Sequence, residues 1–183
     1  HSHPVAKNLL QRDFTTDGPD KTWVSDITYV ATARGWLYLT VFIDLFSRMV
    51  VGWALSSSLS TKMVLAALTR GIRNRRPGPG LIIHSDRGVQ YACKDFRKLL
   101  NKHDFVQSMS RKGDCWDNAV VESFFGSLKS ERVHWRSYQT REEARADIVE
   151  YITMFYNSHR LHSYLGYQSP DQFEANGRMA NAA

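Results

Sequence analysis

Cysteine, proline and long apolar runs are all scarce in this chain of 183 residues, which has two cysteines and five prolines. Cys93 and Cys115 lie far apart and form no Cys-x-x-Cys pair, so neither a zinc site nor a disulfide scaffold is expected. Both are interpreted as small, mostly buried residues, and a reducing cytoplasm suits them. No stretch approaches the roughly 18 apolar residues that a transmembrane helix needs, so no membrane association is expected.

The chain also starts without a signal peptide, because residues 1–4 provide neither the charged region nor the apolar region that one requires. This start favours either a remnant of cloning or a truncation within a longer protein. Hydrophobic residues make up 43% and charged residues 23%, which is typical of a globular protein in water. The length suits one α/β domain with a full hydrophobic core.

Positive charge exceeds negative charge. Lys and Arg total 24 against 18 for Asp and Glu, a difference of six, and the pI is about 9.4. A basic surface favours polyanions, because each neutralised phosphate releases counterions. Many proteins of this charge never bind nucleic acid, so charge alone leaves both interpretations open.

The hydrophobic pattern changes its period along the chain. Runs of β-branched and aromatic residues predict strands, and apolar residues three or four apart predict helices. The expected strands cover residues 23–30, 36–43, 49–55, 81–84 and 105–109. The expected helices cover residues 61–76, 92–103 and 118–132, followed by one that starts at the capping box Thr140 to Glu143 and a short closing helix from Pro170.

This order, βββ-α-β-α-β-α-α, predicts an α/β fold with a mixed five-stranded sheet flanked by helices, in a ribonuclease-H-like layout. Short connections between the first three strands favour an antiparallel meander. Residues 1–21 are interpreted as a flexible lead-in, residues 22–175 as the core domain and residues 176–183 as a disordered tail.

Three acids stand out by their positions. Asp26 lies inside the first expected strand, where aspartate is disfavoured. Asp86 follows the fourth strand, at the end where open α/β sheets place their sites. Glu122 lies in the first turns of the helix that begins near residue 118. If the first and fourth strands are neighbours at the centre of the sheet, the aspartates converge, and a crossing helix adds the glutamate.

Such a cluster has the chemistry of a divalent-metal site. Mg²⁺ prefers oxygen ligands, and two ions roughly 3.5–4 Å apart can activate an attacking oxygen and stabilise a leaving one. Asp26 stands among apolar residues, where a lone carboxylate costs free energy unless something pairs with it. Asp86 could equally be a turn residue and Glu122 a solvated acid, so the residues alone leave the metal-site and structural interpretations open.

The blocks around these acids resemble the signature motifs of insertion-sequence transposases, in the branch whose catalytic domain is often called OrfB. The blocks are residues 23–29 (WVSDITY), 84–91 (HSDRGVQY) and 117–125 (DNAVVESFF). Between Asp86 and Glu122 lie 122 − 86 − 1 = 35 residues, the DD(35)E spacing shared with retroviral integrases. The segment from Tyr156 to Pro170 also resembles that branch's C-terminal signature, so the resemblance covers roughly residues 8–175.

The resemblance implies a DDE-type transposase with an integrase-type catalytic core. Asp26, Asp86 and Glu122 would be both the catalytic residues and the ligands of Mg²⁺ or Mn²⁺ in a two-metal site. Hydrolysis at the element's end would free a 3′-hydroxyl, and strand transfer by that hydroxyl would follow, during DNA transposition and integration. The implied partners are DNA, as element ends and target, and further copies of the chain in a homo-oligomer on DNA. This branch usually carries an N-terminal helical DNA-binding segment that these residues lack, which leaves the recognition of element ends open.

Two other functions stay open beside this one. The first is a ribonuclease-H-like nuclease that cleaves but does not join. The second is a catalytically silent DNA-binding or assembly module, which the loss of an acid would have favoured, and none is lost.

Six side chains near the expected site are candidates for DNA contacts. Lys129 lies two helical turns after Glu122 on the same face, and it matches a position where related integrases carry a DNA-contacting lysine. The others flank the site or belong to the closing segment: Arg87, Arg111, Lys112, Arg160 and His162. Each could equally be a solvated charge, and Arg160 and His162 could brace the core.

Overall fold

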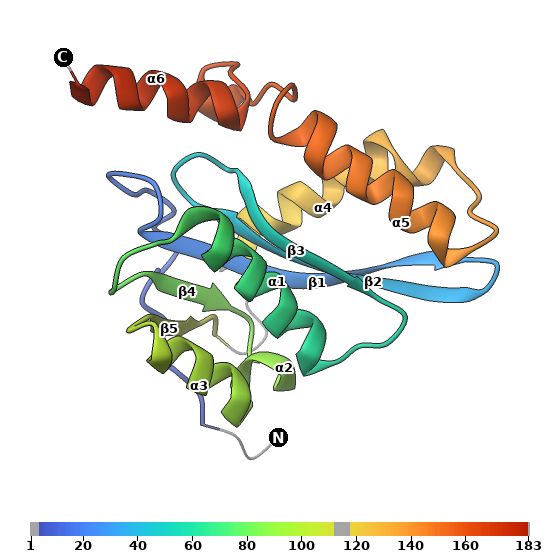
Figure 1. The fold of residues 1–183 in the computed structure, drawn as a ribbon, viewed down its shortest axis with the longest axis horizontal. Coiled ribbons are helices and arrows are strands. Elements are labelled where there is room, and N and C mark those ends of the chain that lie inside the picture. Colours follow the sequence, from blue (N-terminus) through green and yellow to red (C-terminus); the bar gives the residue numbers. More distant parts are fainter. Residues whose placement is uncertain (1–3, 112–117, 183) are drawn as a thin grey trace.

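A mixed sheet of five strands runs through the middle of the molecule (Figure 1). The computed structural model describes residues 4–111 and 118–182. The strands lie in the order β3-β2-β1-β4-β5, so β1 is central. Their bounds are β1 Thr22–Thr32, β2 Gly35–Asp44, β3 Val50–Ser56, β4 Ile82–Ser85 and β5 Val106–Met109.

The connections between strands determine how they pair. β1, β2 and β3 follow one another through short turns and pair antiparallel, because a short turn reverses the chain directly. β4 and β5 each follow a helical crossover, and they pair in parallel, β4 with β1 and β5 with β4. The predicted meander and the predicted neighbourhood of the first and fourth strands are both confirmed.

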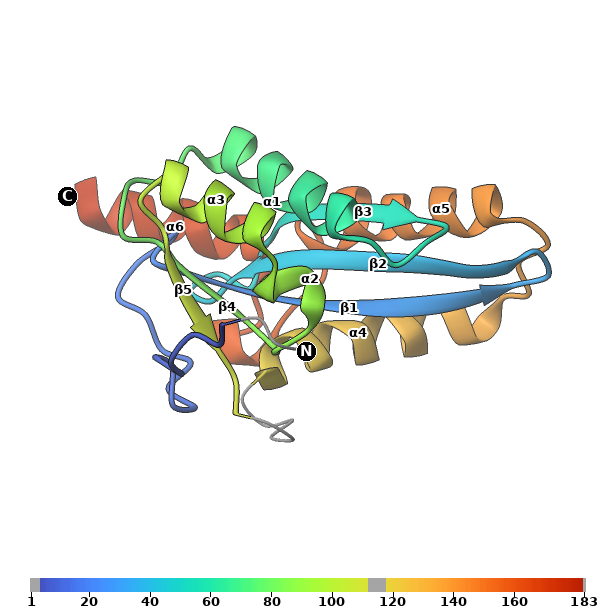
Figure 2. The same cartoon turned by 90° about the horizontal axis from the view of Figure 1, so that it is seen from below.

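Helices cover both faces of the sheet. In Figure 2, α1 and α3 lie above the strands and α4 lies below them. α1 and α3 pack around Trp23 and Phe42 on one face, and α4 and α5 pack around Val24 and Val41 on the other. The helix bounds are α1 Thr61–Arg75, α2 Val89–Ala92, α3 Lys94–Lys102, α4 Ala119–Glu131, α5 Arg141–Glu150 and α6 Pro170–Ala182. None of the helices in the described ranges is long and apolar enough to cross a membrane.

Local sequence signals account for most helix ends. The Ser60 side chain accepts a hydrogen bond from the Met63 backbone N–H at the start of α1. Thr140 accepts one from the Glu143 N–H at the start of α5, as the capping box predicts. Beyond α5 the chain continues as a wider, π-type helix over Tyr151–Tyr156, which the apolar periodicity did not reveal.

Helix α6 corrects one expectation from the sequence. The chain from residue 176 was predicted to be disordered, but the helix continues to Ala182. Glu174, which is 5% exposed, accepts hydrogen bonds from both Nη atoms of Arg75 at 2.8 Å, and Arg75 Nε also contacts Asp20 at 2.9 Å. Because a buried carboxylate is stable only when paired, this ion pair anchors α6 to α1.

The lead-in of residues 4–21 contains no helix or strand in the structure. It is nevertheless attached to the core, since Leu10 is buried and the Leu9 N–H donates to the Ser108 hydroxyl at 2.9 Å. Of the two cysteines, Cys93 is half-buried and caps α3, and Cys115 lies outside the described residues.

Two glycines let α1 lie close against β3. A Cβ atom at Gly52 would lie 2.3 Å from the Ala67 carbonyl oxygen, and Gly71 faces the Trp23 ring.

We expect Gly52→Ala to destabilise the protein by about 3 kcal/mol, because the backbone of α1 would have to move. Gly126→Ala is the matched control. A Cβ there meets open space in α4, so a gain of about 0.5–1 kcal/mol is expected. Urea denaturation measures both, and a Gly52→Ala variant as stable as the parent would contradict this packing.

Candidate active site

Asp26 and Asp86 lie beside each other at the end of the parallel pair β1 and β4. The last pair in the register is Val24↔His84, and each aspartate lies two residues further along its own chain. Because side chains alternate along a strand, Asp26 faces the same side of the sheet as Val24, which is the side covered by α4. Asp86 occupies a turn in which the Gly88 N–H donates to its Oδ1 at 2.8 Å.

Helix α4 adds the third acid. Glu122 lies in the first turn of α4 and is exposed. Asn118, four residues earlier and on the same face, is buried. Its Nδ2 donates to the Ser25 carbonyl oxygen at 3.2 Å, and its amide also bonds the Asp26 carboxylate. Asn118 therefore holds the start of α4 against β1, with Glu122 on the side of Asp26.

Asp26, Asp86 and Glu122, here called the acid site, influence one another electrostatically. Burial raises the pKa of Asp26 to about 6, against a hydrogen bond from the Ile27 N–H, and the negative charges of Asp86 and Glu122 raise it further. Asp26 is half-buried, whereas the other two acids are exposed. Negative charge thus gathers where the pairing of β1 with β4 ends, with Asp26 as its innermost member.

Other residues of the sequence blocks support the strands beneath the acid site. The Tyr91 hydroxyl, from α2, lies 2.8 Å from Ser25 Oγ. Burial, followed by the charge of Asp26, raises the pKa of Tyr91, so the phenol stays protonated. His84 Nδ1 lies 2.8 Å from Ser108 Oγ and joins β4 to β5. Tyr91 and His84 therefore tie the strands that carry the aspartates to their neighbours within the core.

The chemical type of the donor atoms at the acid site suits a hard divalent cation. The acids supply only oxygen, and the buried Oδ1 of Asn118 has no hydrogen-bond partner in the described part of the chain. Within residues 4–111 and 118–182, however, no three His, Cys, Asp or Glu side chains form a group that could hold a metal ion as they stand. Ligation by all three acids therefore requires the exposed Asp86 and Glu122 side chains to move, and their assignment as metal ligands stays a prediction.

Lys129 lies on α4 two turns beyond Glu122, as expected. It is half-buried, and its Nζ lies 5.7 Å from the centre of the Tyr29 ring, a cation–π distance. Tyr29 is 55% exposed and three residues after Asp26. Tyr29 faces the other side of β1 from Asp26, so it is the seven-residue spacing from Glu122 that puts Lys129 on the same flank of α4 as that acid.

For the other three basic residues expected close to the acids, the structure gives weaker support for a place at the acid site. Arg87 follows Asp86, but its Nε donates to the Ser110 carbonyl oxygen at 2.8 Å. Arg111 is exposed at the end of a described segment. Lys112 lies outside the described residues, so its predicted role is not addressed by the structure.

Arg160 and His162 lie on the other flank of α4, away from the acids. Arg160 donates to both carboxylate oxygens of Glu131 at 2.7–3.0 Å. Burial, and then the positive charges of Arg160 and Arg48, lower the pKa of His162 to about 4, so its ring is neutral at pH 7. The two residues border a pocket beside α4 and do not join the acid site.

Sequence reasoning missed two residues that the structure singles out. Asn118 had a signal, because an asparagine four residues before Glu122 shares its helix face. Arg48 had none, since its burial and its backbone conformation, with φ of 62°, come from contacts with distant segments.

Retroviral integrases are among the solved structures with the same fold. The HTLV-2 integrase catalytic core domain, in complex with magnesium, has a TM-score of 0.69 and 14% identity, over 87% of this chain and 99% of that one. A chain of the simian T-cell lymphotropic virus intasome has a TM-score of 0.74 and 18% identity, over 94% of this chain and 59% of that one. The architecture is therefore that of a ribonuclease-H-like integrase core, as predicted from the sequence.

Family comparison agrees with the architecture. The integrase core domain model matches residues 16–115, and a second integrase core domain model matches residues 122–177. The chain belongs to the integrase core domain family.

Within this family, the chain is similar to proteins of bacterial insertion sequences. Transposase InsF for insertion sequence IS3A, from Escherichia coli strain K12, is 46% identical over 174 residues, which are 95% of this chain and 60% of that protein. An uncharacterized 31 kDa protein of insertion element IS600, from Shigella sonnei, is 44% identical over 173 residues, which are 94% of this chain and 64% of that protein. The chain thus spans about three fifths of the length of these curated relatives.

The raised pKa of Asp26 makes the stability of the metal-free protein depend on pH. The carboxyl has a pKa of about 6 when folded and 3.8 as an ordinary aspartate, so the folded state binds its proton more tightly. Asp26 therefore destabilises the fold increasingly as pH rises from about 4 to about 6. We expect Asp26→Asn in EDTA to raise the free energy of unfolding at pH 7.5 by about 1–3 kcal/mol, and by almost nothing near pH 4.

Denaturant titrations at the two pH values measure this difference. Asp17→Asn, in the exposed lead-in, is the matched control and should show no such gain. A loss of stability in Asp26→Asn at pH 7.5 would show that the carboxylate is a structural partner and not a strained site residue.

Proposed function

We propose that this chain is the catalytic core of an insertion-sequence DNA transposase. It would cut phosphodiester bonds at element ends and join the freed strand ends to other sites in DNA. The observation that carries this proposal is that Asp26 and Asp86 follow the last residue pair of β1 and β4, with Glu122 near enough to act on Asp26 electrostatically, in a chain of the integrase core domain family. The similarity to InsF transposases supports DNA transposition as the process, in the bacterial cytoplasm and on its DNA.

In this proposal the acid site holds Mg²⁺ or Mn²⁺. Burial is the main cause of the raised pKa of Asp26, and the negative charges of Asp86 and Glu122 add to it, a repulsion that a bound cation would relieve. The bound ions would activate an attacking oxygen and stabilise the leaving one. The magnesium in the HTLV-2 integrase core structure supports the choice of metal.

The chain's own residues would act by positioning. Asn118 would restrain the Asp26 carboxylate, so that this inner ligand is oriented before DNA arrives, whereas Asp86, which accepts from the Gly88 N–H, and Glu122 would move onto the metal. Lys129 would bind a phosphate along α4 and direct the strand toward Glu122. Strand transfer forms one phosphodiester as it breaks another, so neither an external energy source nor a covalent enzyme–DNA bond is required.

The proposal also covers the binding partners of the chain and the bounds of its catalytic unit. DNA would bind as element ends and as target, and several copies of the chain would assemble on it. The intasome and the trimeric form of the viral structures support assembly of this fold. We place the catalytic unit at residues 22–175, to which the rest of α6 is attached through Glu174.

No observation on the described residues favours a nuclease without joining activity or a silent module. All three acids are present, and Asp26 is retained at a cost in stability, which argues against a silent module. A joining assay with a pre-cut 3′ end separates a transposase from a nuclease.

We expect Glu122→Gln to reduce joining by at least about 100-fold, because the variant keeps the shape of the side chain but removes a ligand charge. Joining is measured with a labelled duplex that carries a pre-cut 3′ end, in Mn²⁺. Glu142→Gln, which is exposed in the first turn of α5, is the matched control and should join at the parental rate. Parental joining by a clean preparation of Glu122→Gln would overturn the assignment of the acids.

Lys129→Gln should weaken duplex binding about three- to tenfold and reduce the slope of log affinity against log salt by about 0.9, the value for one lost phosphate contact. Fluorescence anisotropy at several salt concentrations in EDTA measures both quantities. Lys98→Gln, on the exposed side of α3, removes the same charge from another part of the surface and should leave the slope unchanged. An unaltered slope in Lys129→Gln would remove this residue from the DNA path.

A further inference from the structure

A pocket of about 490 Å³ lies on the flank of α4 that faces away from Glu122. Its walls come from α4, from the turn between β2 and β3, and from the loop of residues 156–167. Ala119, Ser123 and Ser127, each four residues apart, form the α4 wall. The volume lies within the roughly 300–1,000 Å³ that is usual for small-ligand sites.

Arg48, from the β2–β3 turn, supplies an unusual charge to this pocket. It is 9% exposed, and among the described residues its guanidinium forms no ion pair. Nη1 donates to the Leu45 carbonyl oxygen at 3.0 Å, and the guanidinium lies 4.1 Å from the centre of the Tyr164 ring. Burial lowers the pKa of Arg48, which reflects a charge held away from water.

The carboxylate of Asp44 compensates this charge only in part. Asp44 acts on Arg48, but its own oxygens accept hydrogen bonds from the Asp20 N–H and from Ser47. A buried guanidinium without an ion-paired anion is costly, so an anion beside Arg48 would be favoured.

The backbone of Arg48 is also strained. Its φ of 62° lies in the left-handed region, where a residue with a side chain is disfavoured. A glycine or asparagine would adopt this conformation more readily, and neither would place a positive charge in the pocket. Strain of this kind is typical of residues held in place for binding.

The loop adds aromatic rings and a free polar atom. Tyr164 is 59% exposed and Tyr167 is 72% exposed, and both line the pocket. The Nε2 of His162 is buried and has no hydrogen-bond partner within the described residues. Exposed rings beside a buried positive charge are the combination that binds unpaired nucleotides, through base stacking and a phosphate contact.

We propose that this pocket, the Arg48 pocket, binds one unpaired nucleotide of the DNA, with its phosphate against Arg48 and its base against the exposed Tyr167 ring. The inference rests on the proposed function, because it assigns a second contact to the same DNA. The exposed Gly126 lies on α4 between the Ser123 wall of the pocket and Glu122, and with no side chain there a strand can cross the helix closely. One strand would then be held on both flanks of α4.

Binding of a fluorescent single-stranded oligonucleotide in EDTA tests this assignment without any chemistry. We expect Arg48→Gln to weaken binding about tenfold or more and to lower the salt slope by about 0.7, the single-strand value for one phosphate. Tyr167→Ala should weaken binding at least about fivefold by removing a stacking ring. Because Tyr167 is largely exposed, this second variant keeps the test valid if Arg48→Gln fails to fold, which its melting temperature reports.

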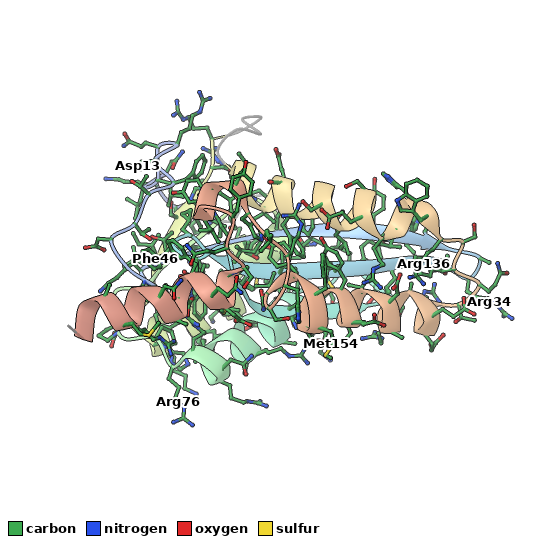
Figure 3. The ribbon with its side chains drawn as sticks, turned by 90° about the horizontal axis from the view of Figure 1, so that it is seen from above. Asp13, Arg34, Phe46, Arg76, Arg136 and Met154 are labelled. Atoms are coloured by element: carbon green, nitrogen blue, oxygen red, sulfur yellow. The ribbon has the colours of Figure 1, made fainter. Side chains whose placement is uncertain are left out.

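Matched controls remove a charge and a ring elsewhere. Arg34→Gln changes an exposed arginine at the hairpin tip, which Figure 3 shows far from Phe46, a neighbour of Arg48 in the same turn. Trp135→Ala removes an 82% exposed ring outside the pocket. Both should bind within about twofold of the parent.

The outcomes separate this inference from the proposed function. Tyr167→Ala and folded Arg48→Gln that bind the oligonucleotide like the parent would overturn the Arg48 pocket, even if the parent still joins DNA in Mn²⁺. A lower melting temperature of Arg48→Gln with unchanged DNA affinity would also overturn it, since Arg48 would then only brace the loop. A parent protein that neither binds nor joins DNA would overturn the proposed function itself.

Discussion

The parallel pairing of β1 with β4 is the contact on which the rest of the structure depends. It sets Val24 opposite His84, so that the next positions on the same face, Asp26 and Asp86, end beside each other. Gathering carboxylates at the edge of a core disfavours folding, and the hydrophobic packing on both faces of the sheet has to offset that effect. Residues that break the local rules in this way are expected where a protein keeps a functional site.

Helix α4 connects that pair to the remaining chemistry. Val121, Phe124 and Leu128 are buried against the sheet and leave the two flanks of the helix for other uses. One flank carries Glu122 toward the aspartates, and the other carries Ser123 into the Arg48 pocket. A packed helix holds such groups in a constant relation to one another, which a loop of the same length does not.

The C-terminal segment braces this arrangement from outside. Asn157 exchanges two hydrogen bonds with the backbone of Val50, at 2.9 and 3.0 Å, and so fastens the segment to β3. Arg160 pairs with Glu131 at the end of α4, and Glu174 pairs with Arg75 of α1. Asn157 and Arg160 belong to the segment that resembles the family's C-terminal signature, and their contacts hold the pocket loop against α4.

The sequence by itself determined the strands, most of the helices and the candidate acids, because periodicity, caps and motif spacing are local properties that a chain carries before it folds. It did not reveal the wide helix over Tyr151–Tyr156 or the continuation of α6, which follow from packing and from the Glu174 ion pair. Only the tertiary structure decided that Asn118 holds Asp26 and that Arg48 is buried without a paired anion. Those properties depend on contacts between segments far apart in the chain, and no local pattern records them.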